Sequence, residues 1–63
     1  MKAKELRELD KDGLANKIEE LEELHFKFRF QKISGQLENP SKLRMTRRDI
    51  ARAKTIFTQK GFN

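Results

Sequence analysis

The sequence predicts an all-α fold: a long antiparallel two-helix hairpin preceded by a short N-terminal helical segment. Three observations support this prediction. The chain has 63 residues, which suffices for one small domain covering 1–63. Leu, Glu, Lys and Arg dominate its composition, and these residues favour helix over strand. One strong break, at 35–39, separates two long stretches of similar length, and a short loop makes such helices antiparallel neighbours.

Polar and glycine residues mark the limits of the first two elements. A short helical segment is expected at 2–8, and Asp10 after it is a good N-cap for a first long helix at 10–34. Gly35 suits the position just past the end of that helix. At 100° per residue, one face carries an apolar seam. This first seam comprises Leu14, Ile18, Leu21, His25 and Phe28, with Leu24 beside it.

A second long helix is expected at 40–60, after the loop at 35–39. Asn39 suits the N-cap and Pro40 the first helical position. Its apolar positions are spaced 3, 4, 3 and 4 residues apart, which indicates a matching buried face. This second seam comprises Leu43, Thr46, Ile50, Ala53 and Phe57.

Cations occupy the face of the second helix opposite its seam. Arg44, Arg48 and Arg52 form one row at i, i+4 and i+8, with Arg47 and Lys54 flanking the seam. Arginine suits phosphate because its planar fork donates two parallel hydrogen bonds. The row therefore predicts contact with a polyanion.

The net charge of +5 conceals two unlike halves. Residues 1–24 hold five cations and eight acids, a net −3. Residues 25–63 hold ten cations and two acids, a net +8. Such asymmetry indicates that one end faces an anion, while the other faces solvent or a basic protein.

Three apolar residues lie off the seam of the first long helix. Phe26, Phe30 and Ile33 sit about 100° or more away from it, so a single hairpin interface cannot cover them. One possibility is that the N-terminal segment folds back over part of them through Leu6 and Leu9. The other is that they form a docking patch for RNA or a neighbouring protein, since exposed apolar clusters mark interfaces.

Several classes of function are excluded. No run of about 18 apolar residues could form a transmembrane helix, and the N-terminus lacks the apolar region of a signal peptide. The chain has no Cys and a single His, His25, with no nucleophile elbow or phosphate-binding glycine loop. Glu22 and His25 match half of a di-iron motif whose other half is absent. We therefore expect no enzyme, no catalytic residues, no metal and no cofactor.

Several motifs together resemble the family of bacterial large-subunit ribosomal protein number twenty-nine. The opening, Met1 to Arg7, is similar to the N-terminus of that family, and the similarity covers essentially the whole chain. Thr46 stands where the family commonly has Val, and the segment 19–23 is more acidic than usual. The matching motifs are Arg29-Phe30-Gln31, Gly35-Gln36-Leu37, Arg47-Arg48-Asp49-Ile50-Ala51-Arg52 and Lys54-Thr55.

The resemblance implies a helical hairpin bound to large-subunit (23S) ribosomal RNA on the cytoplasmic ribosome. It implies a position beside the nascent-chain exit tunnel, next to ribosomal protein number twenty-three, where trigger factor and the signal recognition particle arrive. It also implies that several arginines face RNA, with Gln31, Gln36 and Asn39 in or near contact. The candidate RNA-binding residues are Arg29, Gln31, Lys32, Gln36, Asn39, Lys42, Arg44, Arg47, Arg48, Arg52 and Lys54.

The sequence therefore predicts a structural, RNA-binding constituent of the large ribosomal subunit. The main alternative is a helical protein–protein interaction or dimerisation module, which the 3,4 spacing of the seams would serve. A helix-turn-helix DNA-binding protein fits less well, because these helices are too long and too nearly antiparallel. A membrane-surface helix fits least, because the apolar residues form two separate patches.

Overall fold

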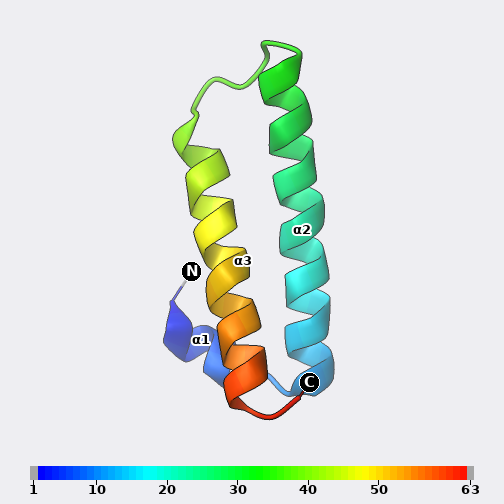
Figure 1. Ribbon diagram of the computed structural model, residues 1–63, viewed down its shortest axis with the longest axis vertical. Helices are drawn as coiled ribbons and strands as arrows, with labels where there is room; N and C mark the ends of the chain where they lie inside the picture. The colour runs from blue at the N-terminus through cyan, green and yellow to red at the C-terminus, as the bar shows by residue number, and fades with distance from the viewer. Residues whose placement is uncertain (1, 63) are drawn as a thin grey trace.

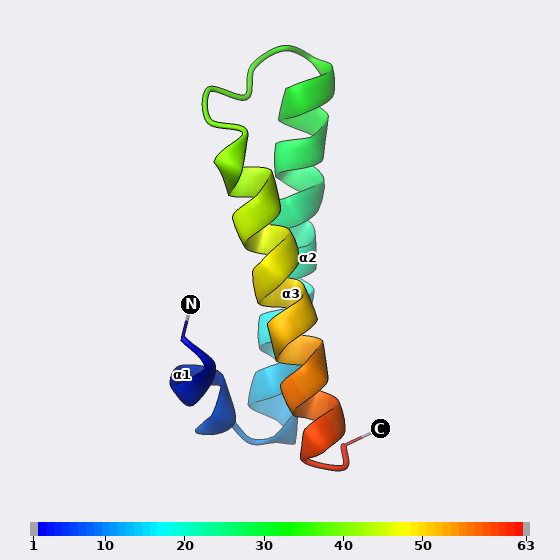
Figure 2. The same cartoon turned by 60° about the vertical axis from the view of Figure 1, so that its left-hand side comes forward.

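The computed structural model describes residues 2–62, which form three α-helices within that range. They are α1 (Ala3–Arg7), α2 (Lys11–Ile33) and α3 (Ser41–Gln59) (Figure 1). The long helices α2 and α3 lie side by side and run antiparallel, as both Figure 1 and Figure 2 show. The predicted all-α fold class is confirmed. Each helix is one residue shorter at either end than the range expected from the sequence.

The ends of α2 are set by local hydrogen bonds. The Asp10 carboxylate accepts a bond of 2.7 Å from the backbone N–H of Gly13. A Cβ on Gly13 would lie 2.9 Å from that carboxylate oxygen, so a larger residue here would have to displace the capping side chain. At the other end, the amides of Gly35 and Gln36 donate to carbonyls of the last turn at 3.2 and 2.8 Å. Gly35 has φ +76°, the left-handed conformation that this type of helix end demands.

The ends of α3 are built in the same way. The Asn39 side-chain oxygen accepts from the Ser41 backbone N–H at 3.0 Å and from its hydroxyl at 2.6 Å. Pro40, between them, already has the helical dihedrals φ −64° and ψ −18°. At the C-terminal end, the Phe62 amide donates to the Phe57 carbonyl at 3.2 Å. Their rings meet edge to face with centroids 5.5 Å apart, which adds an apolar contact to the helix end.

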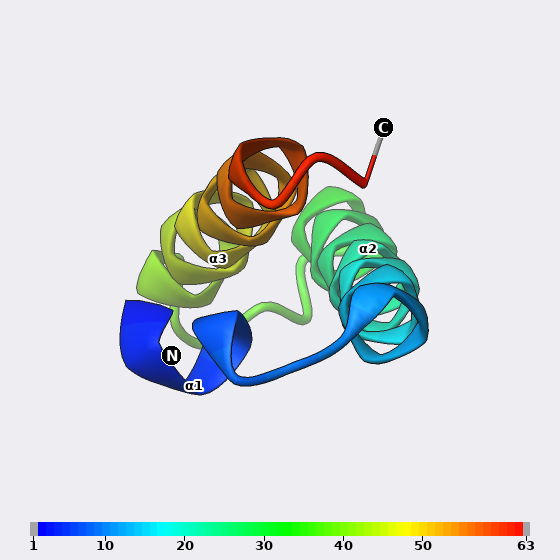
Figure 3. The same ribbon diagram turned by 90° about the horizontal axis from the view of Figure 1, so that it is seen from below.

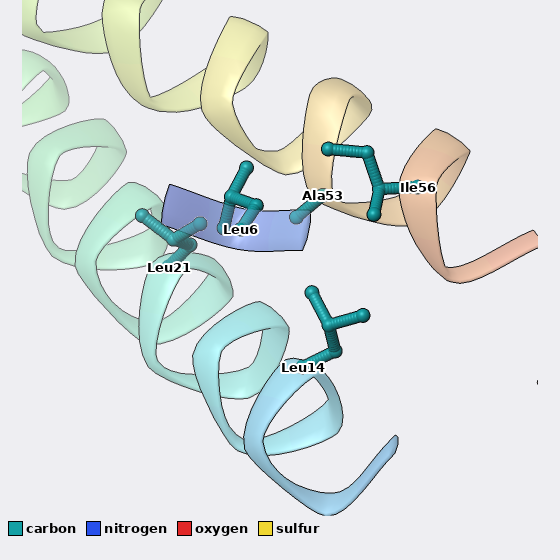
Figure 4. Packing of buried hydrophobic residues seen from close by; sticks show 5 residues of the cluster. All are labelled: Leu6, Leu14, Leu21, Ala53 and Ile56. Atoms are coloured by element: carbon teal, nitrogen blue, oxygen red, sulfur yellow. The ribbon is translucent and has the colours of Figure 1, made fainter. Parts of the chain in front are cut away.

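The buried core lies at the end of the hairpin away from the loop, where all three helices meet (Figure 4). Helix α1 lies beside the C-terminal half of α3 (Figures 1 and 3). Leu6 and Leu14 are fully buried, and burying one leucine is worth about 1.5–3 kcal/mol. The whole buried apolar cluster comprises Leu6, Leu14, Leu21, Ala53 and Ile56.

The two predicted seams pack against each other inside one chain. Thr46 is buried between the helices, and its hydroxyl donates within α3 to the carbonyls of Lys42 and Leu43 at 2.9 and 3.0 Å. The polar atom is therefore satisfied without help from α2. Near α1 the seams are used within the chain, whereas nearer the loop the seam residues His25, Leu43 and Ile50 are only partly buried. Ile56 lies outside the predicted seam and is buried because α1 covers that side of α3.

Lys60 ties the end of α3 to the connection between α1 and α2. Its ammonium donates to the backbone carbonyls of Arg7 and Leu9, the latter at 2.9 Å. Arg7 is the last residue of α1 and Leu9 lies just beyond it, where no later helical turn supplies amides to donate to their carbonyls. The ammonium therefore acts as a C-terminal cap supplied from across the fold. None of the helices in the described part of the chain combines the length and apolarity that a membrane span requires.

Candidate nucleic-acid interface

A groove runs between α2 and α3 over the half of the hairpin nearest the loop. Its sides carry cations from both helices, and Glu22 is the single acid among its lining residues. His25 and the apolar side chains of Ile33, Leu43 and Ile50 complete the lining. The cations are Arg29 and Lys32 from α2, with Arg44, Arg47 and Lys54 from α3.

An ion pair closes the end of the groove that lies farthest from the loop. The Lys54 ammonium lies 3.1 Å from a carboxylate oxygen of Glu22, joining α3 to α2. Both side chains are half-exposed or more, so this bridge contributes about 0–1 kcal/mol to stability. Beyond it toward the loop, the remaining four cations of the groove have no acid among the lining residues.

A second, shallower hollow lies on the outer side of α3. Its lining comprises Arg44, Arg47, Arg48 and Ala51. Arg44 and Arg47 belong to both depressions, so one continuous cationic surface runs from the groove over the flank of α3. The small side chain of Ala51 leaves the guanidinium groups around it accessible.

Other predicted RNA-binding residues lie outside these two depressions. Arg52, the last member of the arginine row, is 3.7 Å from Asp49 in an i, i+3 ion pair. The Lys42 ammonium lies 5.6 Å from the ring centroid of Phe28, a cation–π contact. Asn39 accepts a hydrogen bond from the Ser41 backbone N–H at the start of α3, although Pro40 and not Asn39 occupies the N-cap position. The structure thus gathers some predicted residues into one surface and leaves Gln31, Gln36, Asn39, Lys42 and Arg52 outside it.

The apolar patch of Phe26, Phe30 and Ile33 is uncovered. Leu6 and Leu9 pack into the core at the opposite end, so α1 does not fold over the patch. Of the two possibilities the sequence left open, the structure eliminates the first. Ile33 also lines the groove, so the patch and the cationic surface are contiguous.

One feature of the groove, the pairing of Glu22 with Lys54, is not among the features predicted from the sequence. In the sequence, Glu22 stands out only as half of a di-iron motif, whereas its ion pair with Lys54 joins residues far apart in the chain. A helical wheel of α2 places Glu22 within about 20° of Arg29, which is the signal that identifies it as part of the same face. Within residues 2–62, no His, Cys, Asp or Glu side chains gather in groups that could hold a metal.

The chain is similar to known ribosomal proteins over nearly its whole length. A family model described as ribosomal L29 protein matches residues 4–60. The large ribosomal subunit protein uL29 of Natranaerobius thermophilus is 49% identical over 63 residues, covering 100% of this chain and 97% of the relative. The uL29 of Albidiferax ferrireducens is 53% identical over 60 residues, covering 95% and 88%. That of Carboxydothermus hydrogenoformans is also 53% identical over 60 residues, covering 95% and 87%. With a family match and relatives of this similarity across its helices and loop, the chain belongs to the ribosomal L29 protein family.

Proposed function

We propose that this chain is a structural constituent of the large subunit of cytoplasmic ribosomes and binds 23S ribosomal RNA through its cationic groove. Family membership supports the ribosomal role. The observation that carries the RNA-binding role is the composition of the groove: five cations from two helices against one acid. Such a surface suits a polyanion, because each cation can pair with a phosphate.

The arrangement favours a phosphate backbone held between two helices. Arg29 on α2 faces the groove from one side, and Arg47 on α3 faces it from the other. Guanidinium groups from opposite walls can each bind a phosphate bidentately. This fixes position and orientation without reading base sequence, as is usual for folded RNA. Arg48 and Arg44 extend the contact over the flank of α3.

Salt dependence of binding tests this mechanism. If about five phosphates are neutralised, log affinity falls with log salt at a slope of about −3.5 to −4.5. Between about 50 and 200 mM salt the affinity for a 23S RNA transcript then falls roughly 100- to 500-fold. Arg47→Ala should make the slope shallower by about 0.7–0.9.

Lys11→Ala is the matched control, because it removes the same charge from an exposed site at the far end of α2. Its slope should equal that of the unmodified chain. A salt-insensitive affinity, or equal slopes for the two variants, would refute the assignment of the groove.

The location within the subunit is a finer proposal. We place the chain beside the nascent-chain exit tunnel and next to ribosomal protein number twenty-three, within reach of trigger factor and the signal recognition particle. Family membership supports this placement. Amine-reactive cross-linking of intact large subunits tests it, since the chain offers lysines along its length, including Lys11, Lys17 and Lys27. Cross-links to protein number twenty-three are expected; cross-links only to proteins remote from the tunnel would overturn the placement.

A further inference from the structure

Among residues 2–62, the most exposed large apolar side chains form one strip on α2. Phe26 is 70% exposed, Phe30 63% and Ile33 84%. They are spaced four and three residues apart, so they are neighbours on the helix surface and span about 10 Å along its axis. Two of the three side chains carry aromatic rings, and both residues are largely exposed.

This strip borders the α2 wall of the cationic groove. Ile33 belongs to both surfaces. Arg29 is three residues after Phe26 and four before Ile33, so it neighbours both on the helix surface. Lys27 lies three residues before Phe30. A strand whose phosphates lie in the groove would therefore pass directly beside the rings.

We infer that the strip of Phe26, Phe30 and Ile33 stacks unpaired bases of the RNA whose phosphates the groove holds. The inference rests on the proposed RNA-binding function and adds that the surface prefers RNA with unpaired bases. Phosphate and base project from the same strand, so a ligand that offers both matches a surface in which cations border aromatic rings. Single-stranded loops and bulges are the parts of folded RNA whose bases are free to stack on side chains.

The charges around the strip favour RNA over a protein partner. They also indicate which of the two rings contributes more to RNA binding. Near Phe30 and Ile33 the neighbouring charges are the cations Arg29, Lys27 and Lys32. Near Phe26, one turn earlier, Glu22 and Glu23 lie four and three residues away and repel phosphate. Phe30 should therefore contribute more to RNA binding than Phe26.

Phe30→Leu and Phe26→Leu test the inference, because leucine keeps an apolar, helix-compatible side chain and removes the ring. Affinity for the 23S RNA transcript should fall roughly fivefold or more for Phe30→Leu and less for Phe26→Leu. The salt slope should stay unchanged, because the rings neutralise no phosphate. Met45→Leu is the matched control: Met45 is 57% exposed on α3 and lies outside the strip. It should bind as the unmodified chain does.

A second measurement examines stacking directly. Addition of a single-stranded oligoadenylate should shift the NMR signals of the Phe26 and Phe30 ring protons upfield, while its duplex with oligouridylate should shift them much less. Unchanged RNA affinity in Phe30→Leu, with a normal salt slope, would overturn the inference and leave the groove assignment intact. Loss of the variant from large subunits despite normal RNA affinity would also overturn it, and would assign the strip to a protein neighbour.

Discussion

Glu22→Gln should strengthen RNA binding, although it removes an ion pair. Glu22 is the single acid lining the groove, and its carboxylate lies 3.1 Å from the Lys54 ammonium. Glutamine has nearly the same shape and no charge. The substitution therefore frees Lys54 to bind a phosphate and removes the only repulsive charge among the lining residues. It costs about 0–1 kcal/mol of stability, because the pair is exposed.

The size of the gain follows from Coulomb's law. A phosphate about 6 Å from the carboxylate is repelled by about 0.7 kcal/mol at the dielectric constant of water, which is about threefold in affinity. The half-enclosed groove lowers the effective dielectric constant, so threefold is the lower bound at low salt. If Lys54 then engages one additional phosphate, the salt slope should steepen by about 0.7–0.9.

Fluorescence anisotropy with a labelled 23S RNA fragment across a salt series measures both quantities. Glu19→Gln is the control: it removes the same charge from an exposed site of α2 outside the groove. It should change affinity slightly through net charge and leave the slope alone. Equal gains for the two variants would show that only net charge matters. A loss of affinity for Glu22→Gln would mean that the ion pair shapes the groove, which would refute the repulsive role of Glu22.

Three further predictions concern stability. Asp10→Ala should cost about 1 kcal/mol in thermal unfolding, because the cap on Gly13 is lost, whereas Asp10→Asn should retain most of it. Thr46→Val should stabilise by about 0.5–1 kcal/mol, since a methyl replaces a buried hydroxyl bonded only within its own helix; a fall in melting temperature would contradict this. Lys60→Met should speed amide hydrogen exchange in α1 and leave the exchange rates in the middle of α2 unchanged. An equal increase in the exchange rates of both helices would show that Lys60 is not a local cap.

The features of the fold that depend on local interactions could be predicted from the sequence. Asp10, Gly35 and Asn39 each act within three or four residues of their own position, and the structure shows the bond or dihedral that each implies. The contact of α1 with α3 could not be predicted. It places Leu6 and Ile56, fifty residues apart in the chain, in one buried cluster, and the periodicity of a single helix does not encode such an arrangement.

The candidate site also has local features that the sequence predicts and long-range features that it does not. A helical wheel separates the arginines of α3 from its apolar seam and favours the row of Arg44, Arg48 and Arg52 over the flanking Arg47 and Lys54. The groove lies at the junction of two helices, and its lining takes Arg44 from that row together with the flanking Arg47 and Lys54. Such a surface depends on how α2 and α3 are placed, so only the assembled pair shows it. The prediction that the chain is not an enzyme is confirmed, because its family consists of structural ribosomal proteins.

The core and the candidate RNA surface occupy opposite ends of the hairpin, and this separation has an energetic consequence. Most of the fully buried apolar side chains lie near α1, whereas Leu43, Ile50 and Phe28 nearer the loop are only partly buried. That same half carries the cations of the groove, which repel one another across it. In the free chain the loop half is thus the less stable half. Phosphates bound between α2 and α3 would cancel this repulsion and hold the two helices at a fixed distance. Bound RNA would therefore stabilise the loop half of the hairpin, as the apolar core stabilises the half near α1.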